Sequence, residues 1–409
     1  MRESSPTHFF GLDIGTSTVR CVVGMFDPQK PSELSIIGHG TAKNIGMRKG
    51  VVTHIDDVVE AVTHAITEAE RVSGIHIRGA TVNVNGTHVS GVNSKGVVAI
   101  SATNREISTD DRYRAEEAAT IMQLPPNREI IQVFAKNYRV DGQDNIKDPV
   151  GMHGVRLEVD THIVTAATPN LKNLTTVLER SHVVLNHLTV SSLAAAEAVL
   201  TRQQKEAGTV LLDIGAGTTN LVVTEDGEIQ HVAVLPIGGI HITNDLAIGL
   251  KTDLDIAERV KLEHATLESP DYDSITVESD GKEYSFAKSD IHMITEARVE
   301  ELLDFVDKEL KKIQRSRKLP GGVVIVGGTA KLPGLATFTR DKLQLAARIG
   351  ALQPLQGLVD AVDDPSYATA IGLMQLDMLL MPEGAAGHGT PNQKALGMVE
   401  GLLRRFRRN

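Results

Sequence analysis

Two aspartates, Asp13 and Asp213, have near-identical surroundings in different parts of the chain. Each follows an apolar run and precedes a turn rich in glycine, serine and threonine, FGLDIGTSTVRCVV at 10–23 and VLLDIGAGTTNLVV at 210–223. Such a turn presents hydroxyls and unobstructed backbone N–H groups, and these form a concavity that binds anions. A carboxylate beside a polyphosphate can hold the hydrated Mg²⁺ that accompanies it. These residue types therefore predict a site for Mg²⁺ and a polyphosphate.

The repetition of this segment predicts two domains that begin alike. The copies align without a gap, with the identical pairs Leu12 and Leu212, Asp13 and Asp213, Ile14 and Ile214, Gly15 and Gly215, Thr18 and Thr218, Val22 and Val222, and Val23 and Val223. Each copy predicts a β-hairpin in which Gly15 or Gly215 supplies a positive φ at the turn. One Asp-x-Gly hairpin is a common structural feature of β proteins, whereas a matched pair favours two turns that hold phosphates from both sides.

Three further segments suit the same kind of site. Residues 190–200 (VSSLAAAEAVL) and 365–373 (PSYATAIGL) predict helices with small-residue faces, which can pack closely and form an interdomain hinge. Residues 322–326 predict a buried strand, and the glycines that follow, Gly327 and Gly328, would let the backbone press against adenine and its ribose. The chain has no Walker A and no dinucleotide G-x-G-x-x-G pattern.

Taken in order, these five segments resemble the phosphate 1, connect 1, phosphate 2, adenosine and connect 2 motifs of the actin, heat-shock chaperone and sugar kinase superfamily. Within it the chain is most similar to the FtsA family of bacterial cell-division proteins. Three features carry that similarity: the insert that follows residues 79–86, the segments 237–239 and 257–261, and a basic C-terminus. The resemblance implies an α/β, actin-like two-domain fold with duplicated β-sheet and helix cores, an inserted FtsA-type subdomain 1C and a C-terminal amphipathic helix.

The same resemblance implies a division of the chain into subdomains. They are subdomain 1A at 1–85 and 167–204, subdomain 1C at 86–166, subdomain 2A at 205–245 and 319–380, subdomain 2B at 246–318, a linker at 381–393 and a membrane-binding helix at 394–409.

The hairpins and the resemblance together predict an ATP site, with Mg²⁺ held through water by Asp13 and Asp213. The predicted nucleotide-binding residues are Asp13, Gly15, Thr16, Ser17, Thr18, Asp213, Gly215, Ala216, Gly217, Thr218, Thr219, Asn220, Gly238, Gly239, Glu258, Lys261, Gly327, Gly328 and Thr329.

No catalytic residue is predicted. Ser191 and Ser192 stand where rapidly hydrolysing members often have an acidic residue or glutamine, and a hydroxyl is a poor general base. Glu197 lies later in the same helix. We therefore expect at most a slow ATPase, in which ATP acts as a conformational and polymerisation ligand.

The C-terminus predicts a membrane-binding helix behind a Gly/Pro-rich linker. In KALGMVEGLLRRFRRN the apolar residues Leu396, Val399, Leu402, Leu403 and Phe406 share one face, and the arginines Arg404, Arg405, Arg407 and Arg408 lie at its edge or opposite it. This pattern is typical of a helix lying on an anionic membrane. The alternative is a helix docked on the protein's own core. One tail should bind reversibly, and several tails on a polymer should bind far more tightly.

Composition limits the other function classes. The net charge of −10 argues against a nucleic-acid partner, because such proteins carry a broad basic surface. The single cysteine, Cys21, lies in an apolar run, so we expect a buried thiol. No apolar stretch is long enough to span a bilayer.

A charged helix beginning at residue 295 is expected to bury Val299, Leu302, Leu303, Val306 and Leu310. Its Arg298 is similar to a family arginine that contacts the C-terminal tail of FtsZ, although a solvated helix face explains it equally well. The resemblance implies a polymer that tethers the FtsZ ring to the cytoplasmic face of the inner membrane at the septum and recruits later divisome proteins. The alternatives are an MreB- or PilM-type scaffold and a small-molecule kinase.

Overall fold

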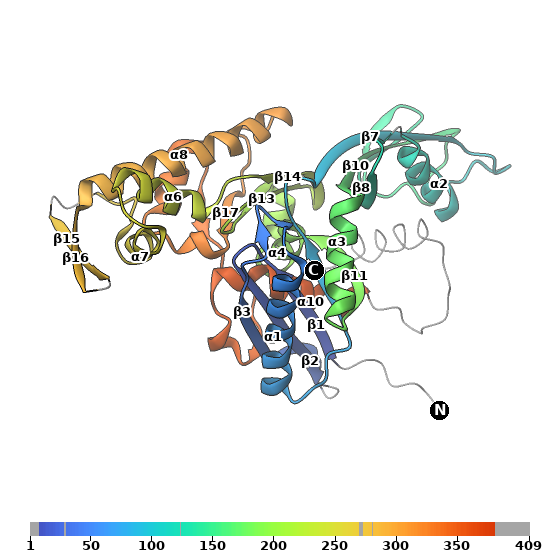
Figure 1. Cartoon of the computed structure of the whole chain (residues 1–409). Helices are drawn as coiled ribbons and strands as arrows, with labels where there is room; N and C mark the ends of the chain where they lie inside the picture. Colours follow the sequence, from blue (N-terminus) through green and yellow to red (C-terminus); the bar gives the residue numbers. More distant parts are fainter. Residues whose placement is uncertain (1–7, 28–29, 123, 270–272, 280, 381–409) are drawn as a thin grey trace.

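The computed structural model describes residues 8–27, 30–122, 124–269, 273–279 and 281–380. The predicted linker and the predicted helix at 394–409 lie outside these residues. Two bodies each contain a sheet with a hairpin at its centre, and an insert and a helical region extend at opposite ends of the molecule (Figure 1). Within the described residues, no helix is long and apolar enough to cross a membrane.

The first sheet has the order β11-β6-β1-β2-β3-β19. Its strands are β1 (His8–Ile14), β2 (Thr18–Asp27), β3 (Lys30–Lys43), β6 (Gly79–Val84), β11 (Val184–Val190) and β19 (Gln356–Gly357). The helix α1 (Ile55–Ser73) packs on β3 and β2, and it approaches closely because Gly38 and Gly40 have no side chains to keep it away. Cys21 of β2 is fully buried there, as expected, and burial raises its pKa to about 12.

The second sheet repeats the arrangement in the order β14-β13-β12-β17-β18. Its strands are β12 (Thr209–Ile214), β13 (Thr219–Glu225), β14 (Glu228–Leu235), β17 (Gly322–Val326) and β18 (Ala347–Ile349). β12 pairs antiparallel with β13 and parallel with β17, just as β1 pairs antiparallel with β2 and parallel with β6. The two predicted hairpins are therefore confirmed.

The predicted role of the turn glycines is wrong. Neither Gly15 nor Gly215 has a positive φ. Each is a glycine because the turn is tight: a Cβ on Gly15 would lie 2.7 Å from the carbonyl oxygen of Thr18, and one on Gly215 would lie 3.2 Å from that of Thr218. The same two carbonyl oxygens accept the N–H groups of Gly15 and Gly215 at 3.1 and 2.9 Å.

The two small-faced helices pack against each other between the sheets. They are α4 (Ser191–Val199) and α10 (Ala368–Leu380), the second preceded by a 3₁₀ turn at Pro365–Tyr367. A Cβ on Gly372 would lie 1.7 Å from the carbonyl oxygen of Ala194, so only glycine permits this approach. One hydrophobic cluster joins both helices to strands of both sheets. The predicted close packing is thus confirmed.

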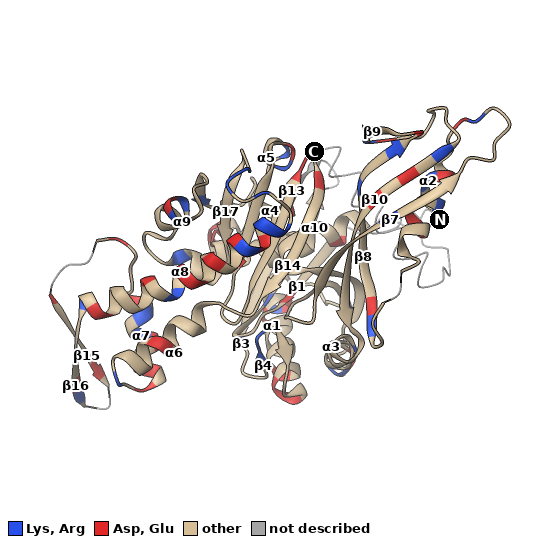
Figure 2. Ribbon diagram, turned by 90° about the horizontal axis from the view of Figure 1, so that it is seen from above, with Lys and Arg blue, Asp and Glu red and all other residues tan. Residues whose placement is uncertain are grey.

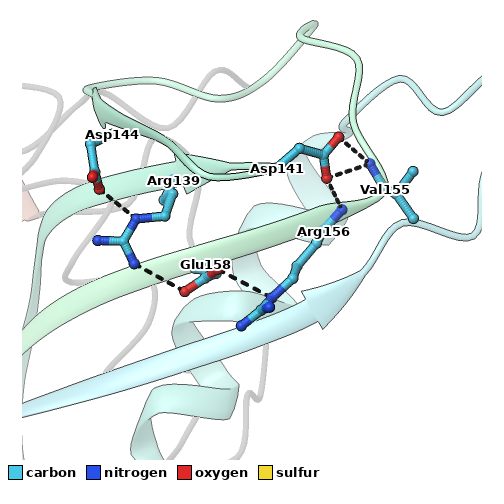
Figure 3. A network of polar contacts seen from close by, with 6 residues as sticks. All are labelled: Arg139, Asp141, Asp144, Val155, Arg156 and Glu158. Atoms are coloured by element: carbon cyan, nitrogen blue, oxygen red, sulfur yellow. Dashed lines mark hydrogen bonds and ion pairs between the residues drawn. The ribbon is translucent and has the colours of Figure 1, made fainter.

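The insert is a separate antiparallel sheet, β7-β10-β8-β9, with one helix on it. Its elements are β7 (Ser90–Ala99), α2 (Thr109–Thr120), β8 (Arg128–Val140), β9 (Gln143–Ile146) and β10 (Arg156–Ala167). At its far end Asp141 accepts the N–H groups of Val155 and Arg156 at 2.8–3.1 Å, and Glu158 pairs with Arg139 and Arg156 (Figure 3). These contacts fasten the β8–β9 hairpin to β10.

The helical region follows the second hairpin. It contains α6 (Gly239–Gly249), α7 (Leu254–His264), the hairpin β15 (Ser274–Ser279) and β16 (Lys282–Ala287), and α8 (Lys288–Lys312). The long helix starts at Lys288, earlier than the expected residue 295, and its predicted inward residues are all buried. Acidic and basic residues alternate along its exposed length (Figure 2). The remaining elements are β4 (Met47–Arg48), β5 (Val51–Val52), α3 (Thr168–Arg180), α5 (Arg202–Ala207), α9 (Leu335–Leu343), and 3₁₀ turns at Gly328–Lys331 and Val359–Ala361.

Candidate functional site

A cavity of about 390 Å³ lies between the two hairpin turns. Most of the predicted nucleotide-binding residues line it, namely Asp13, Gly15, Thr16, Ser17, Thr18, Asp213, Gly215, Ala216, Thr218, Asn220, Gly239, Glu258, Lys261, Gly327, Gly328 and Thr329. Three do not line it. Gly217 packs on Thr16 across the domain boundary, Gly238 packs on the backbone of Ala216, and the buried hydroxyl of Thr219 donates to Ile237 O.

Asp13 is the residue before the last of β1, and it is held by the end of the neighbouring strand β6. Asn83 donates from Nδ2 to Asp13 Oδ1 at 2.7 Å and to Ser191 Oγ at 3.0 Å, while its Oδ1 accepts the N–H of Ile14. Burial raises the pKa of Asp13 to about 7, against the lowering effect of the Arg20 guanidinium; the nearby Asp213 carboxylate adds to the increase.

Asp213 is the counterpart in the second domain. Thr369, from the start of α10, donates from its hydroxyl to Asp213 Oδ2 at 3.1 Å. Burial raises the pKa of this carboxyl group too, although Thr369, Arg20 and Asn220 favour its charged form. Gly327 leaves room for it, because a Cβ there would lie 2.6 Å from Asp213 Oδ1. Two carboxyl groups whose pKa values are both raised by burial fit a hydrated divalent cation, which would favour the charged form of each.

Two buried polar atoms in this cavity have no hydrogen-bond partner among the described residues. They are Nε of Arg20 and Oδ1 of Asn220. Arg20 lies directly opposite Asp13 in the β1–β2 register, and its guanidinium carbon is 5.3 Å from the centre of the Tyr367 ring. An unpaired buried donor is costly, so Arg20 fits an anionic ligand placed between the two turns.

The other end of the cavity is formed by α7 and the turn after β17. Lys261 donates to Glu258 Oε2 at 2.6 Å and to Thr243 Oγ1 at 2.9 Å. A Cβ on Gly328 would meet nothing within 4 Å, so the backbone there is open to the cavity. Thr329 donates to Gly215 O at 3.2 Å and so joins this turn to the second hairpin. Carboxylate, ammonium and open backbone suit a sugar and a flat base.

Sequence reasoning missed several residues that line the cavity, namely Arg20, Asn85, Ile242, Leu262, Lys331, Leu332, Pro333, Ser366 and Thr369. Arg20 could have been found, because the hairpin register places it opposite Asp13. Ser366 and Thr369 belong to a segment that was singled out only for its small residues. Lys331, Leu332 and Pro333 follow closely on the predicted glycines Gly327 and Gly328, so they too could have been found. Asn85, Ile242 and Leu262 depend on how β6, α6 and α7 meet, which no local pattern reveals.

The family models and the sequence relatives that match this chain carry the name of one family. A family model described as "Cell division protein FtsA" matches residues 210–372, and one described as "SHS2 domain inserted in FTSA" matches 86–165. "Cell division protein FtsA" of Bacillus subtilis is 37% identical over 372 residues, which cover 90% of this chain and 82% of that protein. Its counterpart in Pseudomonas aeruginosa is 34% identical, over 91% of this chain and 90% of that protein.

The chain belongs to the FtsA family of cell-division proteins.

Solved structures show the fold that this FtsA-family chain shares. The "PilM-PilN type IV pilus biogenesis complex" superposes with a TM-score of 0.65 at 17% identity, over 90% of this chain and 98% of that one. MreB5 of Spiroplasma citri bound to ADP superposes with a TM-score of 0.52 at 13% identity, over 90% of this chain and 95% of that one. The predicted actin-like fold with an inserted domain is confirmed.

The connect 1 helix of this FtsA-family chain has no carboxylate in the cavity. Ser191 lines the cavity and Ser192 is buried behind it. Glu197 pairs with Lys205 at 2.8 Å, with both side chains buried, and does not line the cavity. Among the described lining residues the only carboxylates are Asp13, Asp213 and Glu258. Beside the turns, Asp13 and Asp213 are therefore the carboxylates that the described residues offer to orient a water.

Arg298, the predicted partner-binding residue, lies on α8 and does not line this cavity. It donates from Nη2 to Asp245 Oδ1 of α6 at 2.8 Å and also pairs with Glu301. These contacts raise the pKa of Arg298, chiefly through the hydrogen bond to Asp245. A partner carboxylate would have to compete with Asp245 and Glu301 for this guanidinium.

Proposed function

We propose that this FtsA-family protein binds ATP with Mg²⁺ between its two hairpin turns and uses the nucleotide to control its own polymerisation. The carrying observation is the pair of buried carboxylates beside the two hairpin turns, with Nε of Arg20 lacking a hydrogen-bond partner among the described residues. ATP supplies a polyphosphate and a bound cation that satisfy these groups together. The relation to MreB5, whose solved structures carry ADP and AMPPNP, supports the choice of an adenine nucleotide.

In this proposal each group has a separate task. The backbone N–H groups and hydroxyls of the turns at 15–18 and 215–218 bind the phosphates. Asp13 and Asp213 hold water ligands of the cation. Glu258, Lys261 and Gly328 orient the nucleoside. Since Ser191 is a poor general base, hydrolysis is slow and ATP serves as a conformational ligand.

The polymer tethers the FtsZ ring to the membrane in this proposal. FtsZ's C-terminal tail binds near Arg298, and the C-terminal residues 394–409 bind anionic lipid at the cytoplasmic face of the plasma membrane, at the septum. Later divisome proteins are then recruited to the same polymer. Each basic residue at an anionic surface contributes about 1 kcal/mol, so single tails bind reversibly and only an assembled row of them binds firmly.

The nucleotide site is tested by titrating ATP into the full-length protein by calorimetry, with and without Mg²⁺. We expect ATP binding that strengthens with Mg²⁺, and about 10- to 100-fold weaker binding in Asp213→Asn. The exposed Asp226 in the turn between β13 and β14 provides a matched control, because Asp226→Asn makes the same charge change outside the cavity. Equal Mg²⁺-dependent affinity in Asp213→Asn and Asp226→Asn would refute the site.

A further inference from the structure

Asn85 lies where three parts of the molecule meet. It directly follows β6 of the first sheet, directly precedes the insert, and lines the cavity between the hairpin turns. From there it reaches the second domain, where Thr218 donates from its hydroxyl to Asn85 Oδ1 at 3.1 Å.

The orientation of the Asn85 amide is fixed by its neighbours. The backbone N–H of Gly86 also donates to Asn85 Oδ1, at 2.6 Å. Because a backbone N–H can only donate, the atom that it meets must be the oxygen, and the flipped amide is excluded. Nδ2 therefore has two hydrogens to give, and it has no hydrogen-bond partner in the part of the chain that the structure describes.

The position of Asn85 within the cavity identifies which part of a nucleotide it would meet. It contacts the second hairpin turn at Thr218, close to where the two turns touch: a Cβ on Gly217 would lie 2.9 Å from Thr16. The residues that suit a nucleoside, Glu258 and Lys261, come from α7, an element outside both turns. Asn85 thus belongs with the phosphate-binding end.

The backbone that follows Asn85 is constrained by close contacts. Gly86 has a φ of +109°, and a Cβ on Gly50 would lie 2.6 Å from Gly86 N, so these two backbones touch directly. Arg128 then donates to His88 O at 2.9 Å and to Thr165 O at 3.0 Å, which joins the entry and exit of the insert. A displacement of Asn85 would therefore displace the insert as a whole.

We propose that Asn85 donates from Nδ2 to the terminal phosphate of a nucleoside triphosphate and so makes the position of the insert depend on the nucleotide. This inference rests on the proposed ATP site. A diphosphate lacks the group that Asn85 would meet, so only the triphosphate adds a contact from Nδ2 to the arrangement that Asn85 already forms with Thr218 and Gly86. The difference in contacts between the two ligands is what shifts the insert's position.

The first test compares ATP and ADP affinities in wild type and Asn85→Asp. Aspartate keeps an oxygen for Thr218 and Gly86 but replaces the free N–H donors with a second, negatively charged oxygen. We expect ATP to bind about 10- to 100-fold more weakly, with ADP changed by less than about threefold. Asn145→Asp, which makes the same charge change on β9 of the insert, should leave both affinities unchanged.

Two outcomes separate this inference from the proposed function. In the first, wild type binds ATP and ADP, and Asn85→Asp either weakens the affinities for both nucleotides by the same factor or leaves both affinities unchanged. Asn85 then does not sense the terminal phosphate. If wild type binds neither nucleotide, the proposed ATP site fails and this inference fails with it. The variant Asn85→Ala removes the donor without adding a charge, so its preference for ATP over ADP should fall less than that of Asn85→Asp. A preference that is undiminished in both variants would also overturn the inference.

The second test measures the insert directly. Spin labels at Glu117→Cys on α2 and Thr337→Cys on α9 report the separation of the insert from the second domain, and the native Cys21 is buried and remains unlabelled. We expect different distance distributions with ATP and ADP in wild type, and coincident distributions in Asn85→Ala. Coincident distributions in wild type would contradict the coupling.

Discussion

At the scale of single residues, Asp13 makes the nucleotide-free protein sensitive to pH. Burial raises its pKa from the usual value of 3.8 to about 7. Between these values the native state keeps a proton that the unfolded state has released, so the contribution of this group to stability falls as pH rises from about 4 to about 7. The carboxylate that the cation needs is thus the form that destabilises the empty site.

The variant Asp13→Asn isolates this effect, because asparagine stays neutral at every pH. We expect the unfolding free energy of Asp13→Asn, minus that of wild type, to increase by about 2 to 4 kcal/mol between pH 5 and pH 8. The measurement is urea unfolding of both proteins at both pH values, without Mg²⁺ or nucleotide. A stability difference between the two proteins that does not change with pH would show that Asp13 is not held in a desolvated site.

Individual residues also show the limits of sequence reasoning at this scale. Asp13 and Asp213 could be identified because their surroundings repeat, and the turn residues followed from them. Asn85 could not be identified, because its role comes from Thr218, which is brought beside it only by the packing of the two domains. The same holds for Thr369, whose hydroxyl meets Asp213 from a distant part of the chain.

At the scale of elements, the contact of α4 with α10 determines how closely the two domains approach. Gly372→Ala places a methyl group where the carbonyl oxygen of Ala194 lies, 1.7 Å from the new Cβ. The strain should exceed the gain of about 1 kcal/mol in helix propensity, for a net loss of about 2 kcal/mol or more. Thermal unfolding measures it, with Gly328→Ala as the control because open space surrounds that Cβ. Equal unfolding midpoints for Gly372→Ala and Gly328→Ala would contradict the close packing.

Secondary-structure elements were predicted where one short pattern determines them. Both hairpins and both small-faced helices follow from apolar runs, turn chemistry and small side chains. The start of α8 was placed too late because residues 288–294 (KSDIHMI) carry only a weak helical apolar pattern, and Ile291 is buried through packing of the helical region. For the insert, the resemblance gave only its bounds and not its strands, and the edge strand β7 is mostly exposed and shows little alternation.

At the scale of the whole molecule, the central claim is that nucleotide-controlled assembly sets how firmly the protein holds to a membrane. The direct measurement is sedimentation with vesicles containing anionic lipid, with and without ATP and Mg²⁺. It compares the full-length protein, a chain ending at Pro382, and Asp213→Asn. We predict that ATP increases the pelleted fraction of the full-length protein severalfold, has little effect on Asp213→Asn, and leaves the shortened chain in the supernatant. Equal pelleting of the shortened and full-length chains, or pelleting indifferent to ATP, would contradict the account.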